Sequence, residues 1–222
     1  MTYNLEQIKN KLNKLNTIFF DLDGTIVDTE KIYFRFWKEA SKIYGYELKD
    51  EEALNLRSRE HKSAKEYIEH VSNGKLDFDI VRNKRIELMK EYFLDYPIEL
   101  KEGAKELLTK LNSEGKYIYI VSANEANKTW NILKKTNIDY LVKDVISSKD
   151  VKRGKPFPDV YLKACQLAGV RPQDVLTFED APCGLKSSYD AGCFTVMVED
   201  IDQYNDNIDY VSGAVSSLKE LL

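Results

Sequence analysis

Cysteine is scarce in this sequence, and its scarcity argues against two kinds of support for the fold. Only three of the 222 residues are cysteine, at positions 165, 183 and 193. An odd number without paired spacing fits neither a disulfide framework nor a zinc site. Such usage is typical of a reducing compartment, so we predict a cytoplasmic location.

Long apolar runs and concentrated positive charge are also missing. No segment approaches the roughly 18 apolar residues of a membrane span, and charged residues from Glu6 to Lys14 interrupt the N-terminal region. The 33 Lys and Arg residues are scattered, and 37 Asp and Glu residues bring the formal net charge to -4. Because nucleic acids require a basic stripe, we expect neither a membrane nor a nucleic-acid partner. No apolar surface helix is obvious, so a monomer is expected.

What the sequence does contain is a regular alternation of strand-like and helix-like segments. After an amphipathic helix within the first sixteen residues, short β-prone runs stand at residues 17–20, 117–121, 144–147, 175–178 and 194–198. Helical apolar stripes separate the later runs. Strict alternation of this kind predicts an α/β fold, a Rossmann-like doubly wound parallel sheet.

One stretch departs from the alternation. Between residues 29 and 97 there are helical stripes around Phe36, Ile68 and Met89 but no convincing strand. We therefore predict an inserted all-helical cap domain at 29–97, and a catalytic core made of 1–28 and 98–222.

Polar residues gather where the predicted strands end. Asp21 and Asp23 follow the first strand, Ser122 the second, and Glu179 with Asp180 a later one. In a parallel sheet these ends share one edge, where ligands bind. Carboxylates brought together there would repel one another unless a cation lay among them. All-oxygen ligands favour a hard divalent ion, and we predict Mg²⁺.

This set of groups suits phosphoryl transfer, in which a phosphate is held and its charge neutralised. Asp21 would act as the nucleophile, and Asp23 as the acid that protonates the leaving oxygen and the base that activates water. The predicted phosphate-binding residues are Gly24, which allows a tight turn, Ser122, the amides of Ala123 and Asn124, and Lys155.

These residues also carry a resemblance to a known family. The string from Asp21 to Thr25 resembles the DxDGT signature of the haloacid dehalogenase-like hydrolase superfamily, and Ser122, Lys155 and the pair Glu179 and Asp180 match its later motifs in order. The wider strings FDLDGTIVDTE (20–30), GKPFPDVYLKA (154–164) and FEDAPCGLKSSYDAG (178–192) resemble the subgroup with a helical cap that includes β-phosphoglucomutase and sugar-phosphate phosphatases. The resemblance implies that the cap selects the substrate.

The resemblance also assigns a metal site. It implies magnesium ligands at Asp21, the backbone carbonyl of Asp23, Glu179 and Asp180. From the residues alone, Glu179 could equally orient Asp180 through water rather than ligate the metal. Both alternatives stay open at this point.

The cap offers weaker signals. Arg59 and Glu60 resemble the pair with which β-phosphoglucomutase contacts its distal phosphate, and Arg82 lies where a cap lysine is used. An arginine on an exposed helix surface is the competing interpretation. Tyr33 stands where that mutase has a histidine, and Thr25 where it tends to carry an apolar residue. These two departures favour a phosphatase.

The leading interpretation is a phosphatase of a small phosphorylated metabolite, a sugar phosphate above all. A sugar phosphomutase is the first alternative, and a catalytically silent binding module, disfavoured by the intact motifs, is the second. A dehalogenase is disfavoured because a haloacid needs no metal.

His61 and His70 are expected to be exposed structural residues, and Cys183 is expected to have no role in the chemistry. The sequence does not identify the substrate.

Overall fold

The computed structural model describes residues 4–56, 61–202, 204 and 209–222. By its internal contacts the chain forms two compact units. One contains residues 1–28 and 99–222, and the other contains residues 29–98. We describe each unit by itself.

The larger unit is built on a six-stranded sheet with the strand order β3-β2-β1-β4-β5-β6. Every neighbouring pair of strands is parallel. The strands are β1 (Thr17–Phe20), β2 (Tyr117–Ser122), β3 (Asp144–Ser147), β4 (Val175–Glu179), β5 (Phe194–Val198) and β6 (Gly213–Val215). Since β1 pairs with both β2 and β4, the ends of these three strands lie next to one another, with Phe20 opposite Ile120 and Phe178.

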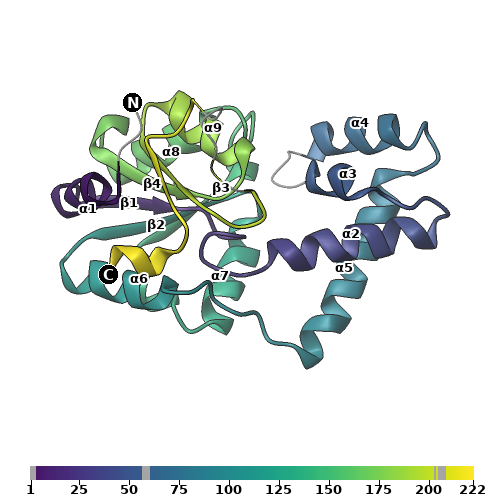
Figure 1. Cartoon of the computed structure of the whole chain (residues 1–222), viewed down its shortest axis with the longest axis horizontal. Coiled ribbons are helices and arrows are strands. Elements are labelled where there is room, and N and C mark those ends of the chain that lie inside the picture. The colour runs from purple at the N-terminus through teal and green to yellow at the C-terminus, as the bar shows by residue number, and fades with distance from the viewer. Residues whose placement is uncertain (1–3, 57–60, 203, 205–208) are drawn as a thin grey trace. The chain divides into compact units, whose positions relative to one another are not determined.

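Helices cover both faces of this sheet, with α6 and α7 on one side and α8 and α9 on the other (Figure 1). The helices of this unit are α1 (Leu5–Lys14), α6 (Ala104–Ser113), α7 (Ala126–Lys135), α8 (Asp159–Ala168) and α9 (Pro182–Ala191), with short 3-10 turns at Asp139–Leu141, Ser148–Asp150, Pro172–Asp174 and Leu218–Leu221. This layering confirms the predicted α/β class, because helices on both faces leave the parallel sheet buried.

In the smaller unit, the regular secondary structure of the described residues is entirely helical. Its helices are α2 (Glu30–Ile43), α3 (Asp50–Leu54), α4 (His61–Val71) and α5 (Phe78–Asp95). They enclose an apolar cluster that includes Trp37, Ile68 and Phe78. The rings of Trp37 and Phe78 lie 5.7 Å apart, which ties α2 to the start of α5. The unit thus has a core of its own.

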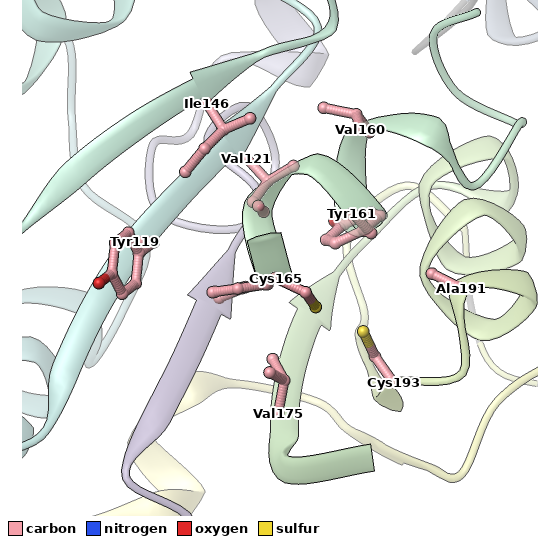
Figure 2. Packing of buried hydrophobic residues seen from close by; sticks show 11 residues of the cluster. Tyr119, Val121, Ile146, Val160, Tyr161, Cys165, Val175, Ala191 and Cys193 are labelled. Carbon is pink, nitrogen blue, oxygen red and sulfur yellow. The ribbon is translucent and has the colours of Figure 1, made fainter. Parts of the chain in front are cut away.

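One apolar cluster of the larger unit lies between the sheet and α8 (Figure 2). It combines residues of β1, β2 and β3 with Tyr161 and Cys165 of α8. Cys165 and Cys193 are buried here with their sulfur atoms turned toward each other. This apolar packing supports the strands whose carboxyl ends carry the polar residues.

Three elements differ from the sequence-based expectation. The helix α3 and the strand β6 were not predicted, because five and three residues respectively are too short to show a periodicity. The helix α5 begins at Phe78, well ahead of the apolar stripe expected around Met89, because Asp77 caps it by accepting from the Ile80 amide at 3.0 Å. Among the described residues, none of the helices is both long and apolar enough to cross a membrane.

Candidate active site

The site begins where β1 ends. The Asp21 amide still donates to Phe178 O of β4 at 2.9 Å, which holds Asp21 at the sheet edge. The chain then turns through Gly24, whose φ of 82° lies in the left-handed region that favours glycine. As a result Asp21 is buried and Asp23 half-buried on one tight loop.

Lys155 is the centre of the buried network. Its ammonium donates to Asp21 Oδ1 at 2.5 Å, to Glu179 Oε1 at 2.6 Å and to the Val121 carbonyl at 2.9 Å. These contacts match the three donors of an ammonium group. Lys155, which was predicted to bind phosphate, is therefore the counter-ion of two carboxylates.

Glu179 is the last residue of β4, and its side chain is fully buried. Its Oε1 accepts from Lys155 and also from the hydroxyl of Tyr161. Its Oε2 is buried without a hydrogen-bond partner. Gly184 of α9 lies so close that a Cβ there would stand 1.9 Å from Oε2.

Asp180 follows directly and accepts a hydrogen bond from Thr25 Oγ1 at 3.2 Å. Asp21, Glu179 and Asp180 each offer a carboxylate oxygen within 4.8 Å of the others, all in a buried setting. With all three carboxylates ionised, the single ammonium of Lys155 would leave an excess of two negative charges. That excess, the all-oxygen donors and the orphaned Glu179 Oε2 fit a hard divalent cation.

Burial and charge shift the pKa values of this cluster. Burial raises the pKa of Asp21 to about 8, helped by the negative charge of Glu179, although Lys155 pulls in the other direction. Burial alone would lower the pKa of Lys155, but Asp21 and Glu179 outweigh it and raise this pKa. Burial, with Glu179 next, raises the pKa of Tyr161 well above its ordinary value. Tyr161 is therefore a hydrogen-bond donor.

Asn124 organises the other side of the site. Its Nδ2 donates to Asp23 Oδ2 at 2.6 Å, and its Oδ1 accepts from Lys128 Nζ at 2.8 Å. Its backbone amide, predicted to bind phosphate, donates to Ser122 Oγ at 3.1 Å. Ser147 Oγ donates to the Asn124 carbonyl at 2.7 Å. The side chain of Asn124 therefore holds Asp23, although only the backbone amide of Asn124 had been predicted to take part in the site.

The remaining predicted residues lie elsewhere. Arg82 is half-buried on α5 of the helical unit. Arg59 and Glu60 fall outside the described residues. His61 and His70 are exposed, and His61 Nε2 lies 2.8 Å from Asp79 Oδ1. The structure thus brings the predicted core residues together, and Arg82 belongs to the other unit.

Sequence reasoning missed four contributors to the site. They are Thr25, Tyr161, Gly184 and the side chain of Asn124. Thr25 and Asn124 stand within or beside the motifs, so their polar side chains could have been considered. Tyr161 looked like one more apolar position in a helix, and Gly184 like an ordinary helical residue. Both lie within the wider strings that carry the family resemblance, but those strings assign them no contact with Glu179.

Comparison with known proteins gives a consistent family. The family model described as haloacid dehalogenase-like hydrolase matches residues 18–198. The chain is 33% identical over 180 residues to hexitol phosphatase A of Escherichia coli (strain K12), covering 81% of each protein. It is 27% identical over 192 residues to the β-phosphoglucomutase of Bacillus subtilis (strain 168), covering 83% of each.

A solved structure agrees in fold. The crystal structure of β-phosphoglucomutase from Clostridium difficile superimposes with a TM-score of 0.77 at 22% identity, covering 94% of this chain and 93% of that one. The family match spans most of the chain, from β1 to the end of β5, and therefore includes Asp21, Lys155 and Glu179. The resemblance expected from the sequence is confirmed, and this chain belongs to the haloacid dehalogenase-like hydrolase family.

Proposed function

We propose that this protein is a magnesium-dependent phosphatase of a small phosphorylated metabolite, a sugar phosphate above all, with Asp21 as its nucleophile. The coarser statement, an enzyme of the phosphatase or phosphomutase type, follows from its family and from relatives named hexitol phosphatase A and β-phosphoglucomutase. The substrate class, the metal and the residue roles are the parts proposed here. A cytoplasmic location and a monomeric state also remain predictions.

The observation that carries the proposal is the charge at the sheet edge. Three buried carboxylates lie together at the ends of β1 and β4, and one buried ammonium pairs with two of them. Burying such an excess destabilises a fold, so a purely structural reason for it is hard to give. A site that holds a divalent cation and a phosphate explains both signs of charge.

In the first step, a carboxylate oxygen of Asp21 attacks phosphorus and the bond from phosphorus to the sugar oxygen breaks. Asp23 gives its proton to the departing oxygen, which leaves as an alcohol. The hydrogen bond from Asn124 Nδ2 to Asp23 Oδ2, at 2.6 Å, keeps this carboxyl group oriented. The product of this step is an aspartyl phosphate on Asp21.

In the second step, water attacks phosphorus and the bond from phosphorus to Asp21 breaks. Asp23, now a carboxylate, accepts the proton of that water. Inorganic phosphate leaves and Asp21 regains its carboxylate. Lys155 keeps Asp21 oriented through both steps by its hydrogen bond of 2.5 Å.

The residues that would hold magnesium are Asp21, Glu179, Asp180 and the backbone carbonyl of Asp23. When bound, the ion supplies positive charge that stabilises the phosphate oxygens during in-line displacement.

The test is a phosphate-release screen of the purified protein with Mg²⁺ over hexose and pentose phosphates, nucleotides and phosphoglycolate. The proposal expects release from sugar phosphates above all. Release confined to nucleotides would overturn the substrate class but not the chemistry. No release from any ester, by protein that is folded and loaded with metal, would overturn the function.

A sugar phosphomutase is the second candidate, favoured by the similarity to the Bacillus subtilis enzyme. It would use the same Asp21 but return the phosphoryl group to a sugar rather than to water. A coupled assay primed with a sugar bisphosphate separates the two. Isomerisation of β-glucose 1-phosphate well above phosphate release would replace the phosphatase with the mutase.

A further inference from the structure

Tyr161 is a buried side chain that the mechanism above does not use. It lies on α8 within the apolar cluster behind the sheet and is fully buried (Figure 2). Although the ring lies among apolar side chains, its hydroxyl donates a hydrogen bond to Glu179 Oε1. A buried tyrosine hydroxyl needs an acceptor, but here the acceptor is a carboxylate of the candidate metal cluster.

The carboxylate of Glu179 is confined on several sides. Lys155 and Tyr161 both donate to Oε1. On the opposite side Gly184 packs against the group, since an added Cβ would come within 1.9 Å of Oε2 and 2.5 Å of Oε1. Gly184 is not in a left-handed conformation, so a glycine here is required by space and not by the backbone. Together these contacts leave the carboxylate little freedom to rotate.

Tyr161 is itself held rigidly. Its ring stacks on Phe19 with centroids 6.4 Å apart and an angle of 24° between the planes. Phe19 belongs to β1, the strand that ends immediately before Asp21. The strand that positions the candidate nucleophile Asp21 therefore also helps to position the Tyr161 hydroxyl.

We propose that Tyr161 is a positioning residue, which fixes the Glu179 carboxylate in the orientation that a divalent cation requires. The inference rests on the metal site of the proposed function and deepens it. Partners that orient metal ligands typically change metal affinity or activity by about 10 to 100-fold when removed. Tyr161 would act through Glu179 and would touch neither metal nor substrate.

Tyr119 offers a matched control in the same cluster. It is buried at 6% exposure, and its ring packs edge-on against Phe19 at 5.5 Å. Tyr119→Phe and Tyr161→Phe each remove one hydroxyl and keep a ring of the same apolar cluster. Only the second change removes a hydrogen bond to Glu179. A merely structural role for the Tyr161 hydroxyl predicts similar behaviour of the two variants.

The experiment measures Mn²⁺ binding by the intact purified protein, from the electron paramagnetic resonance signal of free Mn²⁺, with Mg²⁺ as competitor. We expect Tyr161→Phe to raise the Kd for Mn²⁺ by about 10 to 100-fold and Tyr119→Phe to leave it within about 2-fold. In turnover assays, Tyr161→Phe should raise the half-saturating Mg²⁺ concentration while kcat at saturating Mg²⁺ falls less. Equal Kd values for both variants would overturn the proposal.

Gly184→Ala provides a second route to the same ligand if Tyr161→Phe folds poorly, because its methyl group must displace the Glu179 carboxylate. It too should weaken Mn²⁺ binding by at least about 10-fold, and unchanged binding would contradict the confinement of Glu179.

The outcomes separate the proposed phosphatase function from the positioning role of Tyr161. Metal binding that depends on Tyr161 in a protein without phosphatase activity would sink the function alone. Phosphatase activity with metal binding indifferent to Tyr161 would sink this inference alone.

Discussion

The two units of the chain treat charged side chains differently. In the larger unit, Lys155 and Glu179 form an ion pair in which both side chains are 1% exposed. In the helical unit, the pair Arg35 and Glu39 is 55% and 42% exposed. Another ion pair of that unit, Lys42 with Glu47, is 72% and 71% exposed.

The contrast separates two kinds of contribution. Exposed pairs are screened by water and add little to stability, whereas buried charges shift pKa values and are retained where chemistry needs them. The larger unit therefore carries a site whose charges are fixed by the fold. The helical unit presents charged side chains at its surface, which suits the proposed role in choosing a substrate.

The largest effect should come from Asp21→Asn, which breaks the buried side of the comparison. An amide cannot act as the nucleophile, so kcat should fall by at least about 10⁴-fold while the fold is retained. Asp144→Asn, on an exposed residue of β3, is the control and should retain full activity. Turnover by Asp21→Asn near the wild-type rate, with contamination excluded, would refute the mechanism.

Removal of the metal should have the next largest effect. The enzyme should be silent in excess chelator, and Asp180→Ala should raise the Mg²⁺ concentration needed for half-maximal rate by about 10-fold or more. Ca²⁺ should inhibit, because it takes more ligands at longer distances. Asp190→Ala removes an exposed carboxylate of α9 and should change nothing. Full activity after exhaustive chelation would remove the metal from the account.

A smaller effect concerns stability without metal. The raised pKa of Asp21, about 8 against an ordinary 3.8, means that its ionisation opposes folding as pH rises between these values. Asp21→Asn should therefore melt above the wild type in chelator at pH near 8, by at least about 2 °C, and the gain should shrink toward pH 4. Thermal melts measure this. A lower melting temperature for the variant at pH near 8 would contradict the claim that ionised Asp21 destabilises the metal-free fold.

The smallest effects are expected in the helical unit. Arg82→Ala should raise KM for the preferred sugar phosphate by about 10-fold and leave p-nitrophenyl phosphate nearly unaffected, since only the larger substrate could engage the helical unit. Lys84→Ala, on the same helix and paired with Glu87 at 3.0 Å, is the control. Equal effects of Arg82→Ala on both esters would argue against a role in selection.

The same contrast explains what could be predicted from the sequence. The strands β1 to β5 were predicted almost to the residue because each is a short apolar run ended by a turn or a polar residue. Asp21, Ser122, Glu179 and Asp180 followed from strand ends, since parallel strands bring their ends together. Local pattern and simple topology were sufficient for these residues, and their catalytic roles stay predictions.

Other features depend on contacts between distant segments. Tyr161 and Glu179 are 18 positions apart and meet only because α8 packs against the sheet. Lys155 and Asp21, which are 134 positions apart, were expected to share a phosphate, yet their direct ion pair was not foreseen. In the helical unit, selectivity depends on side chains such as Arg82 whose placement no periodicity encodes.

The central claim, that the carboxylate of Asp21 accepts the phosphoryl group, is tested most directly by locating that group on the protein. Wild-type enzyme is mixed with its best sugar phosphate and Mg²⁺, quenched in acid, digested and analysed by mass spectrometry. The account predicts phosphate on the peptide that contains Asp21, and none in Asp21→Asn. Phosphate on another side chain, or turnover with an unmodified Asp21 peptide at every quench time, would contradict it.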